Sequence, residues 1–153
     1  MKITEILNAD MVLAEVGGAT KPQVLRELAR PLAAKHHELD LTAIAAVLAE
    51  RERLGSTAIG DGIAIPHGKM PGLKEIHGTF GRHRKGVDFD SLDGMPTHLF
   101  FVLVAPEDST SLHLKALARV SRLFKDGAFR DRLMNAADAE ELFRLIVEED
   151  ARY

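Results

Sequence analysis

Apolar residues recur every three or four positions in five stretches of the chain, which is the spacing of amphipathic helices. Most of these stretches begin with polar residues suited to cap a helix, and Gly55 is expected to end the second one. The expected caps are Thr20, with Pro22 in the first turn; Asp40 or Thr42; Ser109, Thr110 or Ser111; and Asp138 with Glu141. The apolar stripes are Val24, Leu25, Leu28 and Leu32; Ile44, Val47 and Leu48; Leu114, Leu117, Val120 and Leu123; Phe129 and Leu133; and Leu142, Phe143 and Ile146.

Strand patterns lie between these helices. The segment 99–104 is apolar without alternation, which is typical of a central strand covered on both faces, and Pro106 is expected to end it. The short runs 57–59 and 63–65 flank Gly-Asp-Gly and predict a tight hairpin. A further strand is expected near 76–81, followed by a turn at Lys85-Gly86 and a short strand at 87–89.

Helices that alternate with strands predict an α/β fold in which helices cover both faces of a sheet. A chain of 153 residues can bury a core as one domain, so residues 1–153 are expected to form a single layered domain. The order of the strands does not follow from the pattern.

Composition narrows the class of protein. The chain has no cysteine, which excludes disulfides and thiolate metal sites and favours a cytoplasmic location. A net charge of −3 with intermixed signs, one Tyr and no Trp argue against nucleic acid as a partner. The longest apolar run, 99–105, is too short to span a bilayer, so no direct membrane insertion is expected. The start of the chain carries the acidic residues Glu5 and Asp10 and lacks the apolar stretch of a signal peptide, so no signal peptide is visible.

The most informative motif is the segment 62–68, which reads Gly-Ile-Ala-Ile-Pro-His-Gly. Its two isoleucines alternate with small residues as in a strand with one buried face. Pro66 prevents further ladder pairing, and Gly68 allows the chain to turn sharply. The motif therefore predicts an accessible His67 at a strand end with little backbone freedom. A neutral imidazole there could act as general base, metal ligand or phosphoryl acceptor.

Other polar groups are candidates to lie beside His67. His113 is expected early in the helix capped at 109–111, where free N–H groups favour an anion. Ligands of α/β sheets gather where strands end and helices begin, so His113 and His67 could form a two-imidazole site. Arg51 ends the second helix before Ser56 and Thr57, and these three could hold phosphate oxygens. From spacing alone, Arg51 is better interpreted as a plain cation at a helix C-terminus.

Several known catalytic and nucleotide-binding motifs are incomplete or absent in the chain. Gly55 and Gly60 have P-loop spacing, but the required Lys-Ser/Thr does not follow. Neither His-Glu-x-x-His nor Gly-x-Ser-x-Gly occurs, which weakens a metallohydrolase or α/β-hydrolase interpretation. No role is assigned to the histidines at other positions, which are His36, His37, His77, His83 and His98.

With these residues assembled, the chain resembles an enzyme IIA domain of the phosphoenolpyruvate-dependent phosphotransferase system, of the mannitol/fructose type and closest to its nitrogen-regulatory branch. Three blocks carry the resemblance, in order along the chain. They are Arg-Glu-Arg-Leu-Gly-Ser-Thr at 51–57, Gly-Asp-Gly-Ile-Ala-Ile-Pro-His-Gly at 60–68, and Leu-Val-Ala-Pro-Glu at 103–107 continuing to His113-Leu114. The resemblance covers nearly the whole chain.

The resemblance implies a mixed, roughly five-stranded sheet between helices. It implies that His67 takes a phosphoryl group from a small phosphohistidine carrier of the HPr kind, with His113 as the second active-site histidine and Arg51 as the nearby arginine. The protein would be a phosphoryl-group transferase component with a covalent phosphohistidine, not a stand-alone turnover enzyme, and would need no cofactor and no metal. A free-standing domain fits nitrogen- or carbon-linked regulation of target proteins.

Alternatives stay open at this point. The chain could be a sugar-uptake component that passes phosphate to a fructose- or mannitol-type IIB domain. It could, from another class, be a metal-dependent hydrolase using His67 and His113, or a binding module that is never phosphorylated. Met70 and Leu73, just after His67, are candidates for the rim on which a partner docks, although ordinary loop residues fit equally well.

Overall fold

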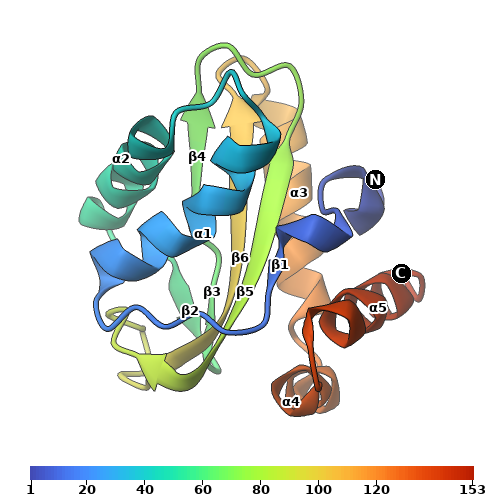
Figure 1. Cartoon of the computed structure of the whole chain (residues 1–153). Helices are drawn as coiled ribbons and strands as arrows, with labels where there is room; N and C mark the ends of the chain where they lie inside the picture. The colour runs from blue at the N-terminus through green and yellow to red at the C-terminus, as the bar shows by residue number, and fades with distance from the viewer.

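One mixed β-sheet runs through the molecule with helices on both of its faces, in a computed structural model that describes all residues 1–153 (Figure 1). The strands are β1 (Val12–Leu13), β2 (Ala58–Gly60), β3 (Ile63–Ala64), β4 (His67–Met70), β5 (His77–Val87) and β6 (Thr97–Pro106). The helices are α1 (Lys21–Lys35), α2 (Leu41–Arg53), α3 (Thr110–Leu123), α4 (Gly127–Asn135) and α5 (Ala139–Asp150), with 3-10 turns η1 (Ile3–Glu5) and η2 (Ala9–Met11). The predicted α/β class is confirmed.

The sheet has the strand order β1-β5-β6-β3-β2, and β4 also pairs with β6. The pairs β1–β5, β3–β6 and β4–β6 are parallel, whereas β5–β6 and β2–β3 are antiparallel. Strand β3 pairs with Leu99 and Phe100, and β4 pairs with the later stretch from Leu103 to Pro106. These two strands therefore follow one another along the same side of β6, and the sheet is about five strands wide, as expected.

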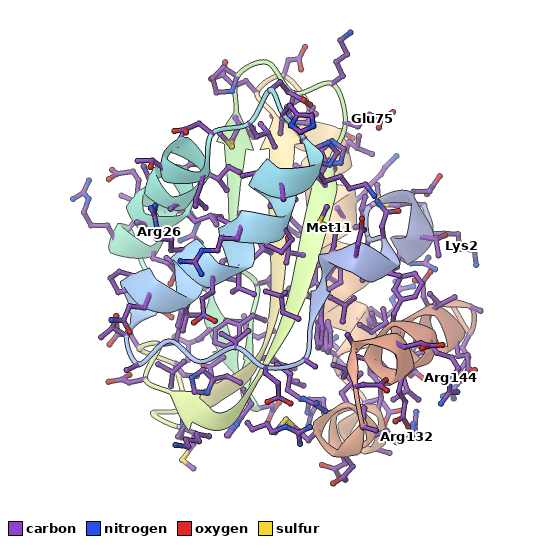
Figure 2. The ribbon with its side chains drawn as sticks, in the orientation of Figure 1. Lys2, Met11, Arg26, Glu75, Arg132 and Arg144 are labelled. Carbon is purple, nitrogen blue, oxygen red and sulfur yellow. The ribbon has the colours of Figure 1, made fainter.

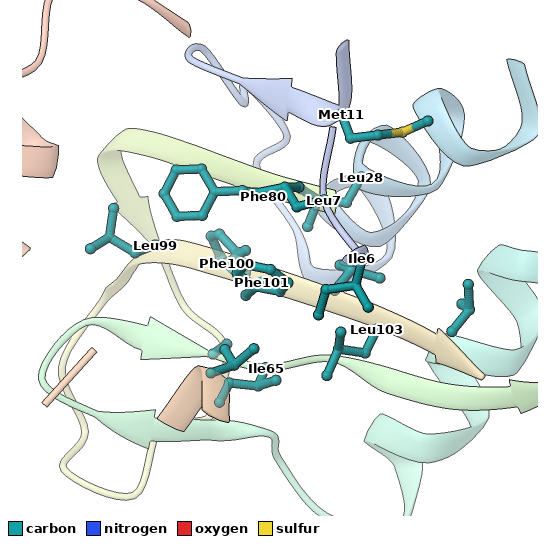
Figure 3. Packing of buried hydrophobic residues seen from close by; sticks show 14 of the residues in the cluster. Ile6, Leu7, Met11, Leu28, Ile65, Phe80, Leu99, Phe100, Phe101 and Leu103 are labelled. Carbon is teal, nitrogen blue, oxygen red and sulfur yellow. The ribbon is translucent and has the colours of Figure 1, made fainter. Parts of the chain in front are cut away.

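Strand β6 is the central strand that its continuous apolar sequence predicts. It pairs on both sides, and almost all of its residues are buried. Figure 3 shows Phe100 and Phe101 of β6 beside Phe80 of β5, whose ring centroid is 6.5 Å from that of Phe101. Helices α1 and α2 pack against β5 and β4, while α3 packs against β6 from the other face (Figure 1). Apolar side chains from both faces form one continuous core.

The helices begin where the capping residues predict. The side chain of Thr20 accepts a hydrogen bond from the Gln23 N–H, and that of Asp40 accepts one from the Ala43 N–H. Asp138 likewise accepts from Glu141 at the start of α5. Helix α3 differs, because the hydroxyl of its N-cap residue Ser109 donates to the Pro106 carbonyl at 2.7 Å instead of capping. The first turn of α3 therefore has N–H groups without a side-chain cap.

The predicted turn at Lys85-Gly86 is wrong, because residues 77–87 form the single strand β5. The short strand expected at 87–89 is also wrong, since only Val87 belongs to β5. The register of β5 against β6 shifts between Arg82 and Val87, as at a β-bulge. Gly86 adopts φ +82° there, and its N–H donates to His83 Nδ1 at 3.0 Å. The glycine thus bends the strand without ending it. A Lys-Gly pair in the sequence is compatible with either such a bulge or a turn.

Two further details differ from the sequence pattern. Leu114 is exposed, and the buried face of α3 consists of His113, Ala116, Val120 and Leu123. A histidine therefore occupies a position that the apolar stripe had given to a leucine. Strands β1 and β4 were not expected at all, because β1 has two residues and β4 reads His-Gly-Lys-Met, without an apolar alternation.

Candidate functional site

His67 is the first residue of β4, where the chain enters the sheet again after Pro66. The proline interrupts the edge between β3 and β4, and its carbonyl accepts a hydrogen bond from the Leu103 N–H at 3.0 Å. His67 therefore begins a strand and does not end one, which corrects the expectation from the motif. Gly68 continues the strand without a turn, and it must be small because a Cβ atom there would collide with Val47 of α2.

The ring of His67 is held in one orientation. Its Nδ1 lies 2.8 Å from the Ile65 carbonyl oxygen. A carbonyl can only accept, so in the neutral ring Nδ1 carries the hydrogen and Nε2 carries the lone pair. The side chain is half-buried. The fold thus leaves the free lone pair of the neutral His67 ring on Nε2.

His113 lies directly beside His67. Strand β6 leads through a short turn into α3, which brings the fourth residue of this helix over the start of β4. The two ring centroids are 5.3 Å apart, and the rings meet edge to face at 85°. Both ring nitrogens of His113 are buried and have no hydrogen-bond partner. A buried polar group without a partner costs about 1–3 kcal/mol, which points to a ligand that supplies the missing bond.

Both imidazoles are disposed to be neutral. Burial lowers the pKa of His67, and Arg51 lowers it further, while the bond to the Ile65 carbonyl and the charge of Glu52 oppose these effects. Burial also lowers the pKa of His113, and the neighbouring His67 and Lys69 add to this lowering. A lowered pKa keeps the lone pair of His67 available at neutral pH.

Cationic groups surround the histidine pair. Arg51 lies in the last turn of α2, and its Nη1 donates to the Gly55 carbonyl at 2.8 Å. The guanidinium has further N–H donors that this bond does not use. Lys69, two residues after His67, donates from Nζ to the Thr110 hydroxyl at the start of α3, at 2.9 Å. Together with the uncapped N–H groups of α3, these residues make the surroundings favourable for an anion.

Ser56 and Thr57 use their hydroxyls within the protein. Ser56 donates to the Phe89 carbonyl at 2.6 Å, and Thr57 is buried and donates to the carboxylate of Glu52. Each hydroxyl therefore already donates its hydrogen within the protein. The expectation that Ser56 and Thr57 donate to a phosphate is not met in this structure. Both residues instead fix the turn between α2 and β2.

Glu52 is a residue that sequence reasoning missed. This carboxylate is buried, and besides the Thr57 hydroxyl it accepts the Thr57 N–H and the Nζ of Lys21, both at 3.1 Å. It thereby joins the start of α1, the end of α2 and the turn before β2. Its place within the block 51–57 was the only available signal, and its burial depends on partners that the local sequence does not reveal, such as Lys21 of α1.

Met70 and Leu73 do not form an accessible rim, because they are only 5% and 8% exposed. Met70 follows the alternation of β4 and points away from the side that His67 faces. The exposed apolar residues near the site in sequence are instead Leu54, after α2, and Leu112 and Leu114, on either side of His113; they are 73%, 41% and 61% exposed.

Nowhere in the chain do three or more His, Cys, Asp or Glu side chains already lie together in positions to hold a metal ion. The pair of His67 and His113 thus has no third ligand beside it. A search for helices able to cross a membrane, by length and apolar character, finds none.

Comparison with known proteins gives consistent results. Residues 5–149 match the family described as phosphoenolpyruvate-dependent sugar phosphotransferase system, EIIA 2. The chain is 42% identical over 149 residues to a nitrogen regulatory protein of Bradyrhizobium diazoefficiens, covering 95% of each chain. It is similar to the crystal structure of nitrogen regulatory protein IIA-Ntr from Neisseria meningitidis, with a TM-score of 0.87 and 34% identity over 94% of this chain and 98% of that one.

A more distant solved structure shares the fold. It is enzyme IIA for mannitol from Escherichia coli, in complex with its phosphorylated enzyme IIB. The TM-score is 0.74 at 20% identity, over 93% of this chain and 97% of that one. This likeness concerns the arrangement of the elements.

Proposed function

Because the chain belongs to the EIIA 2 family of the phosphoenolpyruvate-dependent sugar phosphotransferase system and is a homologue of nitrogen regulatory proteins, we propose that it is a phosphohistidine carrier with a regulatory role. It accepts a phosphoryl group on His67 from an HPr-like carrier protein. Its phosphorylation state then reports nitrogen or carbon supply to target proteins.

One observation carries this proposal, namely the hydrogen bond from His67 Nδ1 to the Ile65 carbonyl. It keeps the lone pair on Nε2, the nitrogen that would attack the phosphohistidine of a docked partner. In the transfer, Nε2 attacks phosphorus in line, the new N–P bond forms, and the N–P bond of the donor breaks. The donor ring, protonated on its other nitrogen, leaves as neutral imidazole with the bonding electron pair. His67 becomes a phosphoimidazolium whose Nδ1–H stays bonded to Ile65, so no proton has to move.

The surrounding groups stabilise the transferred phosphoryl group. Its oxygens carry negative charge, which Arg51 and the N–H groups of α3 can share by charge-assisted hydrogen bonds. The same charge raises the proton affinity of His113, whose unpartnered nitrogens can then donate to a phosphoryl oxygen. Glu52, the carboxylate whose charge acts on His67, is buried and accepts hydrogen bonds from Lys21 and Thr57. Its oxygens are therefore occupied, which suits a carrier that must hold the phosphoryl group without hydrolysing it.

A partner protein docks over the same face. Leu54, directly after α2, and Leu114 of α3 present apolar surface close in the chain to Arg51 and His113, whereas Leu112 lines a separate hollow with Met1 and Ile6. Small transient interfaces of signalling proteins combine such apolar residues with a charged centre. Carrier and receiver proteins would then use one surface in turn.

Reconstitution tests the function. Phosphoenolpyruvate, the first enzyme of the phosphotransferase system and an HPr-like carrier should add one phosphoryl group to the wild-type chain and none to His67→Ala. Labelling that persists in the variant, or no labelling of the wild type, would exclude the proposal. Adding a fructose- or mannitol-type IIB domain separates the two roles, because rapid transfer to it would assign the chain to sugar uptake.

A further inference from the structure

A second pair of histidines lies outside the site just described. His36 follows the last residue of α1, and His77 is the first residue of β5. Their ring centroids are 3.8 Å apart with 33° between the planes. One member of this pair, His36, directly follows α1, whereas His67 lies beside His113 of α3. Helices α1 and α3 cover opposite faces of the sheet (Figure 1).

The fold makes no hydrogen bond with the ring nitrogens of this second pair. The Oε1 atom of Glu38 is 3.9 Å from His36 Nδ1, which is too long for a hydrogen bond. Burial lowers the pKa of His77, and His36 adds to this, while Glu75 and Glu38 oppose it. Two imidazoles with free lone pairs thus lie within the electrostatic reach of two carboxylates.

The pair opens into a hollow of about 510 Å³. Its lining has no apolar side chain and consists of His36, Glu38, Gly72, Lys74, Glu75 and His77. Lys74 contributes one positive charge against the two carboxylates, so the hollow keeps a net negative charge when the imidazoles are neutral. Figure 2 labels Glu75 beside the end of the sheet where β4 and β6 finish.

We propose that His36 and His77, with a carboxylate from Glu38 or Glu75, bind one late first-row divalent cation such as Zn²⁺. Imidazole nitrogen and carboxylate oxygen are the ligands that suit this ion. Zn–N bonds of about 2.0–2.1 Å in tetrahedral geometry place two ligand nitrogens roughly 3.4 Å apart. The two rings are close enough to reach one ion, but they now lie nearly face to face, so both must turn for one nitrogen of each to point at it. The carboxylate is not yet in place. The side chain of Glu38 is 59% exposed, so it can rotate to bring its carboxylate to the ion.

The cation would tie the end of α1 to the start of β5. His77 pairs with Val104 of β6, and Val104 pairs with Gly68, the residue after His67. The metal would therefore stiffen the end of the sheet that also positions the phosphorylation site, without contacting that site.

Isothermal titration with ZnCl₂ of the full unphosphorylated chain tests this site. We expect one Zn²⁺ per chain, and a loss of at least about tenfold in affinity for His36→Gln and for His77→Gln, since even indirect partners of a metal cost that much. His37→Gln is the matched control, because His37 is exposed next to the hollow and outside its lining, and it should bind as the wild type does. His67→Gln should also bind normally.

A second measurement uses the wild type alone and does not depend on how a variant folds. During the titration, the imidazole NMR signals of His36 and His77 should shift together and before those of the other histidines. Absence of binding, unchanged affinity in both His36→Gln and His77→Gln, or loss of binding in His67→Gln would each overturn the proposal. The last result would place the metal at the phosphorylation site.

Discussion

At the scale of single residues, the proposed chemistry depends on two histidines with different partners. The Ile65 carbonyl fixes the hydrogen of His67 on Nδ1, whereas both nitrogens of His113 are buried without a partner. One ring is therefore oriented as a nucleophile, and the other is left able to respond to a new charge. A phosphoryl group on Nε2 of His67 would supply that charge within reach of His113.

The pH dependence of the two rings follows from this. In the free protein, burial lowers the pKa of both His67 and His113, so both should titrate below the ordinary value of about 6.5. Phosphorylation should raise the pKa of His113, because the nearby negative charge favours the imidazolium. NMR titration of the ring signals before and after phosphorylation measures both effects. An unchanged pKa of His113 would remove it from contact with the phosphoryl group.

Arg51 should contribute to the rate of transfer and not to the stability of the fold. We expect Arg51→Ala to slow single-turnover phosphorylation by about ten- to a hundredfold. This factor corresponds to the loss of a hydrogen bond to a charged group, which contributes about 1.5–3 kcal/mol. Its midpoint of urea unfolding should stay close to that of the wild type.

Arg53→Ala is the matched control for this measurement. Arg53 ends the same helix, but its side chain is largely exposed and pairs with Glu50. Its removal should leave the transfer rate unchanged. Equal rates for Arg51→Ala and the wild type would show that the guanidinium does not act on the phosphoryl group.

At the scale of elements, the site depends on how closely β4 lies between α2 and β6. Gly68 permits this approach, because any larger side chain would meet Val47. The position of β4 in turn sets where His67 stands relative to the start of α3. Close packing of a short strand therefore has a direct effect on the geometry of the histidine pair.

Gly68→Ala tests this packing. We expect the free energy of unfolding to fall by about 1–3 kcal/mol, as for other overpacked positions, and Val47→Ala in the same chain to restore part of it. Gly17→Ala is a suitable control, since no atom lies within 4 Å of the added methyl group. Urea denaturation measures all of these variants. A fully stable Gly68→Ala would mean that α2 can move away from β4 at little cost.

Much of this level was predictable from sequence. Thr20, Asp40 and Asp138 determine helix starts through local hydrogen bonds, which a sequence pattern can reveal. The single strand β5 and the strand β4 were not predictable, since both depend on pairing with β6, far away in the chain. The burial of Met70 and Leu73 depends on the same tertiary packing, as does the use of the Ser56 and Thr57 hydroxyls within the fold.

At the scale of the whole molecule, the match to the EIIA 2 family confirms the resemblance that the three sequence blocks suggested. The proximity of His67 and His113 was expected from the general topology of α/β sheets, and the structure brings the rings together. The tautomer of His67 and the buried state of His113 could not be predicted, because both require coordinates. Under the proposed function, the charge added to His67 by phosphorylation would be the signal that target proteins detect.

The position of the phosphoryl group on the ring of His67 tests the central claim most directly. The phosphorylated chain, labelled with ¹⁵N in its histidines, can be studied by NMR of the ring nitrogens. The account predicts that phosphorus is bonded to Nε2 of His67, with Nδ1 still protonated and bonded to the Ile65 carbonyl. A phosphoryl group on Nδ1, or on any other residue, would contradict it.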